Sequence, residues 1–170
     1  AFRYFYAFFR REAFTDQWLE KVLAGSEDFA QRLTDKLEEE VYDALELIAQ
    51  GYLDYRRNRL TSDAATLRQI YEQSLVLLYR MLFIFYAESR EILPLENADY
   101  RSRLSMDSIK KEIANDLRFN RTFDPDSSHY DTRLRDLFFA IDAGNPRYDV
   151  PPYNGRLFSD AEHPFLARNN

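Results

Sequence analysis

The chain contains no cysteine, and its 170 residues include only four glycines and six prolines. The lack of cysteine excludes disulfide bonds and any zinc or iron–sulfur site with cysteine ligands. No proline occurs before Pro94, and the preceding residues contain only two glycines, Gly25 and Gly51. Because glycine and proline interrupt helices most often, their scarcity favours long helices and argues against a turn-rich all-β fold.

Basic side chains are also too few for a nucleic-acid-binding module. The chain has 29 Asp and Glu against 23 Lys and Arg, which gives a formal net charge of −6, and no third of it has a basic excess. Non-specific affinity for nucleic acid comes from clustered cations, so independent binding to phosphate is not expected. The basic residues are 19 Arg and 4 Lys, and arginine is the better of the two for stacked and bidentate contacts at interfaces.

Helical periodicity dominates the first 60 residues. The aromatic stretch 2–14 is expected to pack into a core, and Thr15 is expected to cap a short helix that ends at Leu23. Gly25 and Ser26 then predict a helix stop and a new helix start. From Ser26 to about Arg57 the apolar residues recur at steps of three and four, as on a core-facing helix: Phe29, Leu33, Leu37, Val41, Leu45, Ile48 and Tyr52.

Three arginines, Arg56, Arg57 and Arg59, follow this predicted helix. Cations near the C-terminal end of a helix offset its dipole, which is the structural interpretation of the cluster. The other interpretation is a contact with DNA phosphate or with a neighbouring domain. The sequence leaves both interpretations open.

A second long helix is predicted from Thr61 or Ser62 to about Ile92. Its middle, residues 75–87, is apolar on every face except at Arg80. This pattern predicts a central helix enclosed by others, and the run of 13 residues is too short to span a bilayer. We expect Arg80 to be a structural buried charge, which requires a carboxylate or several carbonyl groups beside it. The expected carboxylates are Glu72, Glu88 or an acidic side chain of the first long helix.

The rest of the chain predicts shorter elements. A helix is expected over 105–118, and residues 134–141 belong to a last helix that ends at Gly144 and Pro146. The expected fold class is all-α: a helical bundle with two long antiparallel helices, shorter flanking helices and a loop-rich C-terminal tail. We expect a helical spacer domain over 1–143 and an extended loop over 144–170 that leads toward a downstream domain. Because the first residue is Ala rather than Met, we also expect a longer parent chain.

Catalytic, cofactor-binding and metal-binding residues are not identifiable in the sequence. The two histidines, His129 and His163, form no Glu-x-x-His or His-Glu-x-x-His pattern. None of the four lysines lies two residues after a carboxylate, so the (D/E)-x-K motif of metal-dependent nucleases is absent. His129 has three acidic neighbours that can hold a cation, although acidic surface loops are common: Asp124, Asp126 and Asp131.

Pro151-Pro152-Tyr153 is similar to the end of the Asn/Asp-Pro-Pro-Tyr motif of amino-group DNA methyltransferases. In that motif the first residue accepts a hydrogen bond from the flipped base, and the tyrosine stacks on the base. Val150 stands at the first position and its side chain cannot accept a hydrogen bond. The glycine-rich loop that binds S-adenosylmethionine is missing as well, so the motif does not predict a methyltransferase site.

Several segments together resemble a known family. They resemble the helical segment that precedes the adenine-N6 methyltransferase domain in large single-chain type II restriction-modification enzymes. Arg156 departs from the pattern, because the family is expected to carry a second glycine there. The segments that carry the resemblance are 5–14, 41–47, 51–53, 70–75, 86–90 with 93–94, 138–142 and 152–158.

The resemblance implies a spacer between a Mg²⁺-dependent nuclease domain and an S-adenosylmethionine-dependent methyltransferase domain of the same chain. Neither cofactor is expected to bind this segment itself. The implied partners are these flanking domains and, through the parent enzyme, duplex DNA; no membrane is expected, and the implied location is the bacterial cytoplasm. A free-standing helical protein–protein interaction module is the main alternative, and a helical enzyme with an acidic site is a weaker one.

Overall fold

The computed structural model describes residues 2–10, 17–124, 126–153 and 155–168. These residues form helices and no β-sheet, apart from one isolated bridge between Asn145 and Val150. The all-α prediction is therefore confirmed. The helices are α1 (Phe2–Phe9), α2 (Trp18–Asp54), α3 (Ala64–Ser89), α4 (Met106–Arg118), α5 (His129–Ala143) and α6 (Pro164–Arg168), joined in part by single helical turns at Arg56–Asn58, Tyr100–Leu104 and Pro146–Tyr148.

The chain divides into two compact units, residues 1–44 and 45–170. The first unit holds α1 and most of α2. There the ring of Phe8 meets Trp18 edge-on, with 5.7 Å between the ring centroids, and the Arg10 guanidinium lies over the same Trp18 ring. The division falls within α2.

Helix α2 runs through Gly25 and Ser26 without interruption, so the predicted stop at this position is wrong. Glycine lowers helix stability by only about 1 kcal/mol relative to alanine, and good helix formers on both sides outweigh it. The predicted cap, Thr15, lies outside the described residues. At its other end α2 stops at Asp54, and a single turn ends at Arg59 in the left-handed conformation, with φ of 52°.

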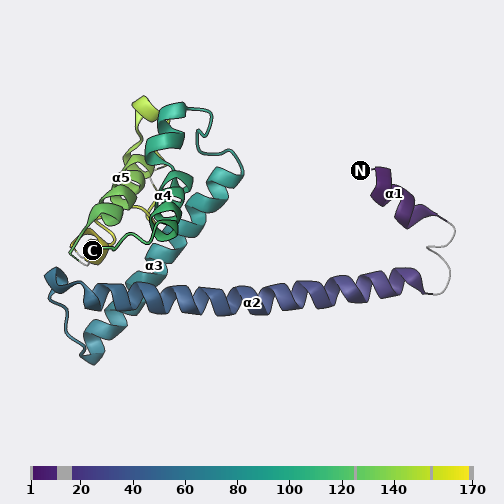
Figure 1. Ribbon diagram of the computed structural model, residues 1–170, viewed down its shortest axis with the longest axis horizontal. Helices are drawn as coiled ribbons and strands as arrows, with labels where there is room; N and C mark the ends of the chain where they lie inside the picture. Colours follow the sequence, from purple (N-terminus) through teal and green to yellow (C-terminus); the bar gives the residue numbers. More distant parts are fainter. Residues whose placement is uncertain (1, 11–16, 125, 154, 169–170) are drawn as a thin grey trace. The chain divides into compact units, whose positions relative to one another are not determined.

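The main core of the second unit lies where α3, α4 and α5 pack together, as Figure 1 shows. Ile84 of α3, Leu137 and Ile141 of α5, and Tyr100 of the turn before α4 are almost completely buried there. Residues after 144, expected as an extended loop, also contribute to the core: Val150 and Phe158 join this cluster, whereas Phe165 and Leu166 of α6 pack with Tyr52 and Ile70.

Helix α3 begins after Asp63, whose carboxylate accepts hydrogen bonds from the backbone N–H groups of Ala65 and Thr66. The prediction that neighbours enclose this helix is wrong for one of its faces. The described residues leave five large apolar side chains of α3 exposed by 42% or more: Leu67, Tyr71, Tyr79, Leu82 and Tyr86. We call these five residues the α3 face.

The predicted helix end at Gly144 is confirmed, because Gly144 is the C-cap of α5. The expectation that this is the last helix is wrong, because α6 follows it. At Gly144 the φ of +78° favours glycine. A Cβ atom at this position would lie 2.8 Å from the backbone nitrogen of Pro152. Glycine is therefore needed for both conformation and space where the chain turns back toward the core.

Candidate functional site

A row of exposed apolar residues lies along the part of α2 that belongs to the first unit. Phe29, Leu33 and Leu37 are spaced by four residues, which places them on one face of the helix, and each is between 57% and 62% exposed. We call these three residues the α2 stripe. Large contiguous apolar surfaces of this kind mark sites of interaction with other proteins or domains.

The surroundings of the α2 stripe are acidic. Between residues 18 and 44 the helix carries eight acidic and three basic side chains, a net charge of −5. One of the basic residues, Arg32, is paired with Asp28 at 2.7 Å. Such a charge repels DNA and a second copy of the same helix, and it attracts a partner whose contact surface has a basic rim.

Arg56, Arg57 and Arg59 are exposed, and among the described residues none of them has an ion-pair partner. The turn that carries them is held by Asn58, whose side-chain amide donates to the Tyr52 carbonyl at 3.0 Å. They lie beyond the last turn of α2, where the field of the helix dipole falls off quickly. This position weakens the dipole interpretation and leaves three cations facing solvent.

Arg80 is only 2% exposed, and its guanidinium lies within the second unit. Its Nε donates a hydrogen bond to the Leu157 carbonyl at 2.7 Å, and its Nη1 is 3.9 Å from Asp160 Oδ1. The guanidinium carbon lies 5.2 Å and 5.8 Å from the ring centroids of Phe138 and Phe158, in the range of cation–π contacts. Burial lowers the pKa of Arg80, an effect that the charge of Asp160 opposes.

The carboxylates expected beside Arg80 lie elsewhere. Glu72 pairs with Arg68 at 3.0 Å on the surface of α3. Glu88 is eight residues from Arg80, about 12 Å along the helix, and it binds the Tyr100 hydroxyl instead. The groups that do contact Arg80 belong to residues between 58 and 80 positions later in the chain, and no local signal in the sequence marks them.

The acidic loop before His129 is not arranged as a metal site. His129 Nε2 lies 2.8 Å from Glu112 Oε1, and Asp131 accepts a hydrogen bond from Arg135 Nε at 2.5 Å. Among the described residues no group of three or more histidine, aspartate or glutamate side chains is placed to hold a metal ion.

Of the segment Pro151-Pro152-Tyr153, the two prolines are exposed and the tyrosine packs within the second unit. The Tyr153 hydroxyl donates to the Ile92 carbonyl at 3.1 Å, and its ring meets Phe83 edge-on. Val150 is 3% exposed and part of the core. Asn154, which also carries the family resemblance, lies outside the described residues.

No protein-family model, curated protein or solved structure is significantly similar to this chain. Within the described part of the chain, no helix combines the length and the apolar character needed to cross a membrane.

Proposed function

We propose that this chain is the helical spacer of a type II restriction-modification enzyme. It connects a Mg²⁺-dependent endonuclease domain to an S-adenosylmethionine-dependent adenine-N6 DNA methyltransferase domain and holds them at a set separation. The observation that carries the proposal is a pair of apolar surfaces that the described residues leave exposed, the α2 stripe on the first unit and the α3 face on the second.

A connector between two domains needs one contact surface for each of them. The α2 stripe and the α3 face meet this requirement, because they lie on different units and each extends over at least two helical turns. Helix α2 has 37 residues, which corresponds to a length of about 55 Å. A helix of this length offers a long surface for contacts with neighbouring domains, as a spacer needs.

Contact with DNA is the subsidiary part of the proposal. Arg56, Arg57 and Arg59 present three exposed cations on one short turn. Within a parent enzyme that already holds duplex DNA, such a turn supports binding to the phosphate backbone without reading the base sequence. The acidic remainder of the chain argues against a larger role in DNA binding.

A free-standing interaction module is the second candidate function. The α2 stripe favours it, because an amphipathic helix with apolar residues at regular steps is the form that binds into grooves of partner proteins. The two candidates differ in where the partner surface is encoded, in the same reading frame or in another gene.

The first test is the reading frame on both sides of this segment. The spacer proposal expects a PD-(D/E)xK nuclease region upstream and a glycine-rich loop with Asn-Pro-Pro-Tyr downstream. A reading frame without these motifs contradicts the proposal and favours the interaction module.

The second test uses the full-length parent protein. Replacing Phe29, Leu33 and Leu37 by serine should loosen the docking of the neighbouring domain and broaden the spread of cut positions mapped on end-labelled DNA. The matched control replaces Gln31, Asp35 and Glu39, which lie on the opposite side of α2, by serine. An equally sharp cut in both triple variants would show that the α2 stripe does not position the nuclease.

A further inference from the structure

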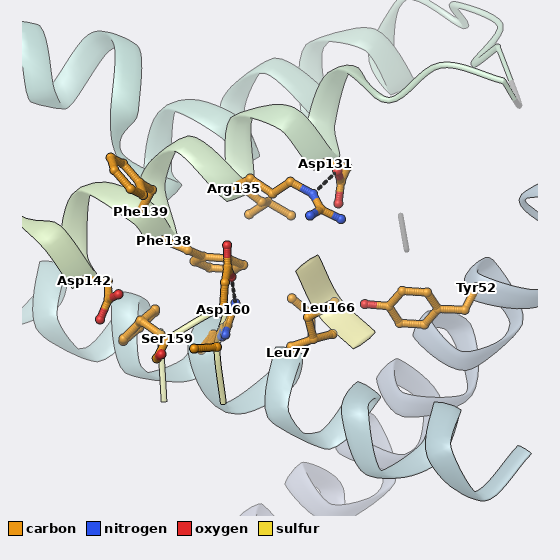
Figure 2. A pocket seen from close by; sticks show the side chains of 14 residues that line it. Tyr52, Leu77, Asp131, Arg135, Phe138, Phe139, Asp142, Ser159, Asp160 and Leu166 are labelled. Carbon is orange, nitrogen blue, oxygen red and sulfur yellow. Dashed lines mark hydrogen bonds and ion pairs between the residues drawn. The ribbon is translucent and has the colours of Figure 1, made fainter. Parts of the chain in front are cut away.

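A pocket of about 300 Å³ lies beside Arg80 in the second unit. Its apolar wall includes Leu77 of α3, Phe138 and Phe139 of α5 and Leu166 of α6. Figure 2 shows that these side chains and several charged ones surround a common space, with Tyr52 at one end. An apolar cavity with a few convergent charged groups is the usual form of a small-molecule site.

Only some of the charged side chains that line the pocket have a close partner of opposite charge. Arg135 and Asp131 neutralise each other through a hydrogen bond of 2.5 Å, drawn as a dashed line in Figure 2. Arg80, Asp142 and Asp160 remain. Among these three, Arg80 is the buried one, and its Nη2 has no hydrogen-bond partner among the described residues.

Asp160 is a weak partner for Arg80. The 3.9 Å between Nη1 and Oδ1 is too long for a hydrogen bond, and the Asp160 side chain is 69% exposed. A buried guanidinium normally gains two short bonds from one carboxylate. Because the Asp160 side chain is exposed, it can rotate away and leave the position beside Nη1 to another carboxylate.

We propose that this pocket binds the carboxylate of a small ligand with an apolar body, which replaces Asp160 as the partner of Arg80. The body of the ligand packs against Phe138, Phe139 and Leu166, which line the space next to the guanidinium. A monocarboxylate fits better than a phosphate dianion, because Asp142 and Asp160 already place negative charge at the lining. The site is separate from the α2 stripe and does not depend on the spacer proposal.

Benzoate is the probe for this site, followed by isothermal calorimetry and by NMR shifts of residues around the pocket. Benzamide, its neutral analogue, and phenyl phosphate, its dianionic analogue, serve as comparators. We expect saturable benzoate binding with shifts centred on residues 80, 138 and 160, weaker binding of phenyl phosphate and none of benzamide. Arg80→Met should weaken benzoate binding about tenfold or more, because it removes a charge-assisted contact.

Asp160→Asn is the variant that separates this proposal from simple apolar binding. This variant should bind benzoate several-fold more tightly, because the competing carboxylate is gone. Since the Asp160 side chain is exposed, its replacement is not expected to disturb the fold. Glu162→Gln is the matched control: Glu162 is a nearby exposed carboxylate whose partner is Arg156. The proposal is overturned if Asp160→Asn binds benzoate with unchanged affinity, or if Glu162→Gln gains as much affinity as Asp160→Asn. It is also overturned if the NMR shifts map outside the pocket, or if benzamide binds as tightly as benzoate.

Discussion

The Glu88 carboxylate accepts a hydrogen bond of 2.9 Å from the Tyr100 hydroxyl inside the second unit. The same carboxylate accepts the backbone N–H groups of Met106 and Asp107, at 2.8 Å and 3.2 Å, in the first turn of α4. One buried side chain thus joins α3, the turn before α4 and the N-terminus of α4, where the helix dipole favours a negative charge. Burial and the neighbouring Glu88 raise the pKa of Tyr100 well above its usual value.

Glu88→Ala should therefore destabilise the protein strongly. It leaves the Tyr100 hydroxyl and two N–H groups without their acceptor, at a combined cost of about 3 kcal/mol in unfolding free energy. Urea unfolding followed by circular dichroism measures the change. The control on the same helix is Glu72→Ala, which removes an exposed ion pair and should change stability by about 0.5 kcal/mol or less. Equal effects of the two substitutions would show that the Glu88 contacts do not stabilise the fold.

Arg80→Ala should lower the unfolding free energy by about 3 kcal/mol, because it opens a cavity and removes the donor to the Leu157 carbonyl. Arg80→Met should be milder, since it fills most of the space and removes a charge whose burial is itself unfavourable. The comparison of the two urea midpoints tests this ordering. A loss below about 0.5 kcal/mol in Arg80→Ala would indicate a surface residue, in conflict with its burial.

Asp63 should make stability depend on acid pH. Hydrogen bonds from the Thr61 hydroxyl, at 2.5 Å, and from Thr66 lower the pKa of Asp63 below its usual value. A carboxylate with a lowered pKa in the folded state stabilises the protein above about pH 4, and this contribution is lost as the pH falls toward the folded-state pKa.

Asp63→Asn keeps an oxygen that can accept at the helix start but does not titrate in this range. Thermal unfolding measured from pH 7 down to pH 2 should therefore show a shallower loss of stability in this variant than in the parent sequence. The control is Glu96→Gln, which removes an exposed carboxylate. In this control the melting temperature should fall at acid pH as steeply as in the parent sequence. A variant curve that runs parallel to the parent curve would refute a role for Asp63 in it.

DNA binding by this chain alone should be weak. With a net charge of −6, we expect a dissociation constant at or above about 10⁻⁴ M at physiological salt, the weak end for non-specific binding. Fluorescence anisotropy with a labelled duplex measures it, and replacement of Arg56, Arg57 and Arg59 by glutamine should weaken any residual binding. Submicromolar affinity that persists in high salt would contradict this prediction.

Local sequence signals predicted two helix boundaries in the second half of the chain. Ser105, expected at the start of a helix over 105–118, accepts the Ser108 N–H at the N-terminus of α4, and Gly144 ends α5. These boundaries are predictable because capping side chains and left-handed glycines lie within four residues of the helix end that they stabilise. Gly25 failed as a signal, because a single glycine is overcome by its helical neighbours.

The sequence showed which positions of the α2 stripe and the α3 face are apolar, but not that they are exposed. The steps of Phe29, Leu33 and Leu37 are the same whether a helix faces a core or solvent, so periodicity could not separate the α2 stripe from the buried positions Leu45 and Tyr52. Accessibility depends on what packs against a helix, and that is not a local property.

From the sequence alone follow the all-α class, the helix ends at Ser105 and Gly144, and the need of Arg80 for a partner, because propensity, capping and desolvation depend on residue type and near neighbours. The start of α3 was expected at Thr61 or Ser62, whereas the structure places the cap at Asp63. Only the tertiary structure decided which groups meet the need of Arg80. Leu157, Asp160 and the rings of Phe138 and Phe158 reach Arg80 through chain folding over long sequence distances. The contact between Glu88 and α4 also depends on the tertiary structure. The first N–H groups of a helix have no partner within the helix, and packing brings the Glu88 carboxylate within reach of two of them.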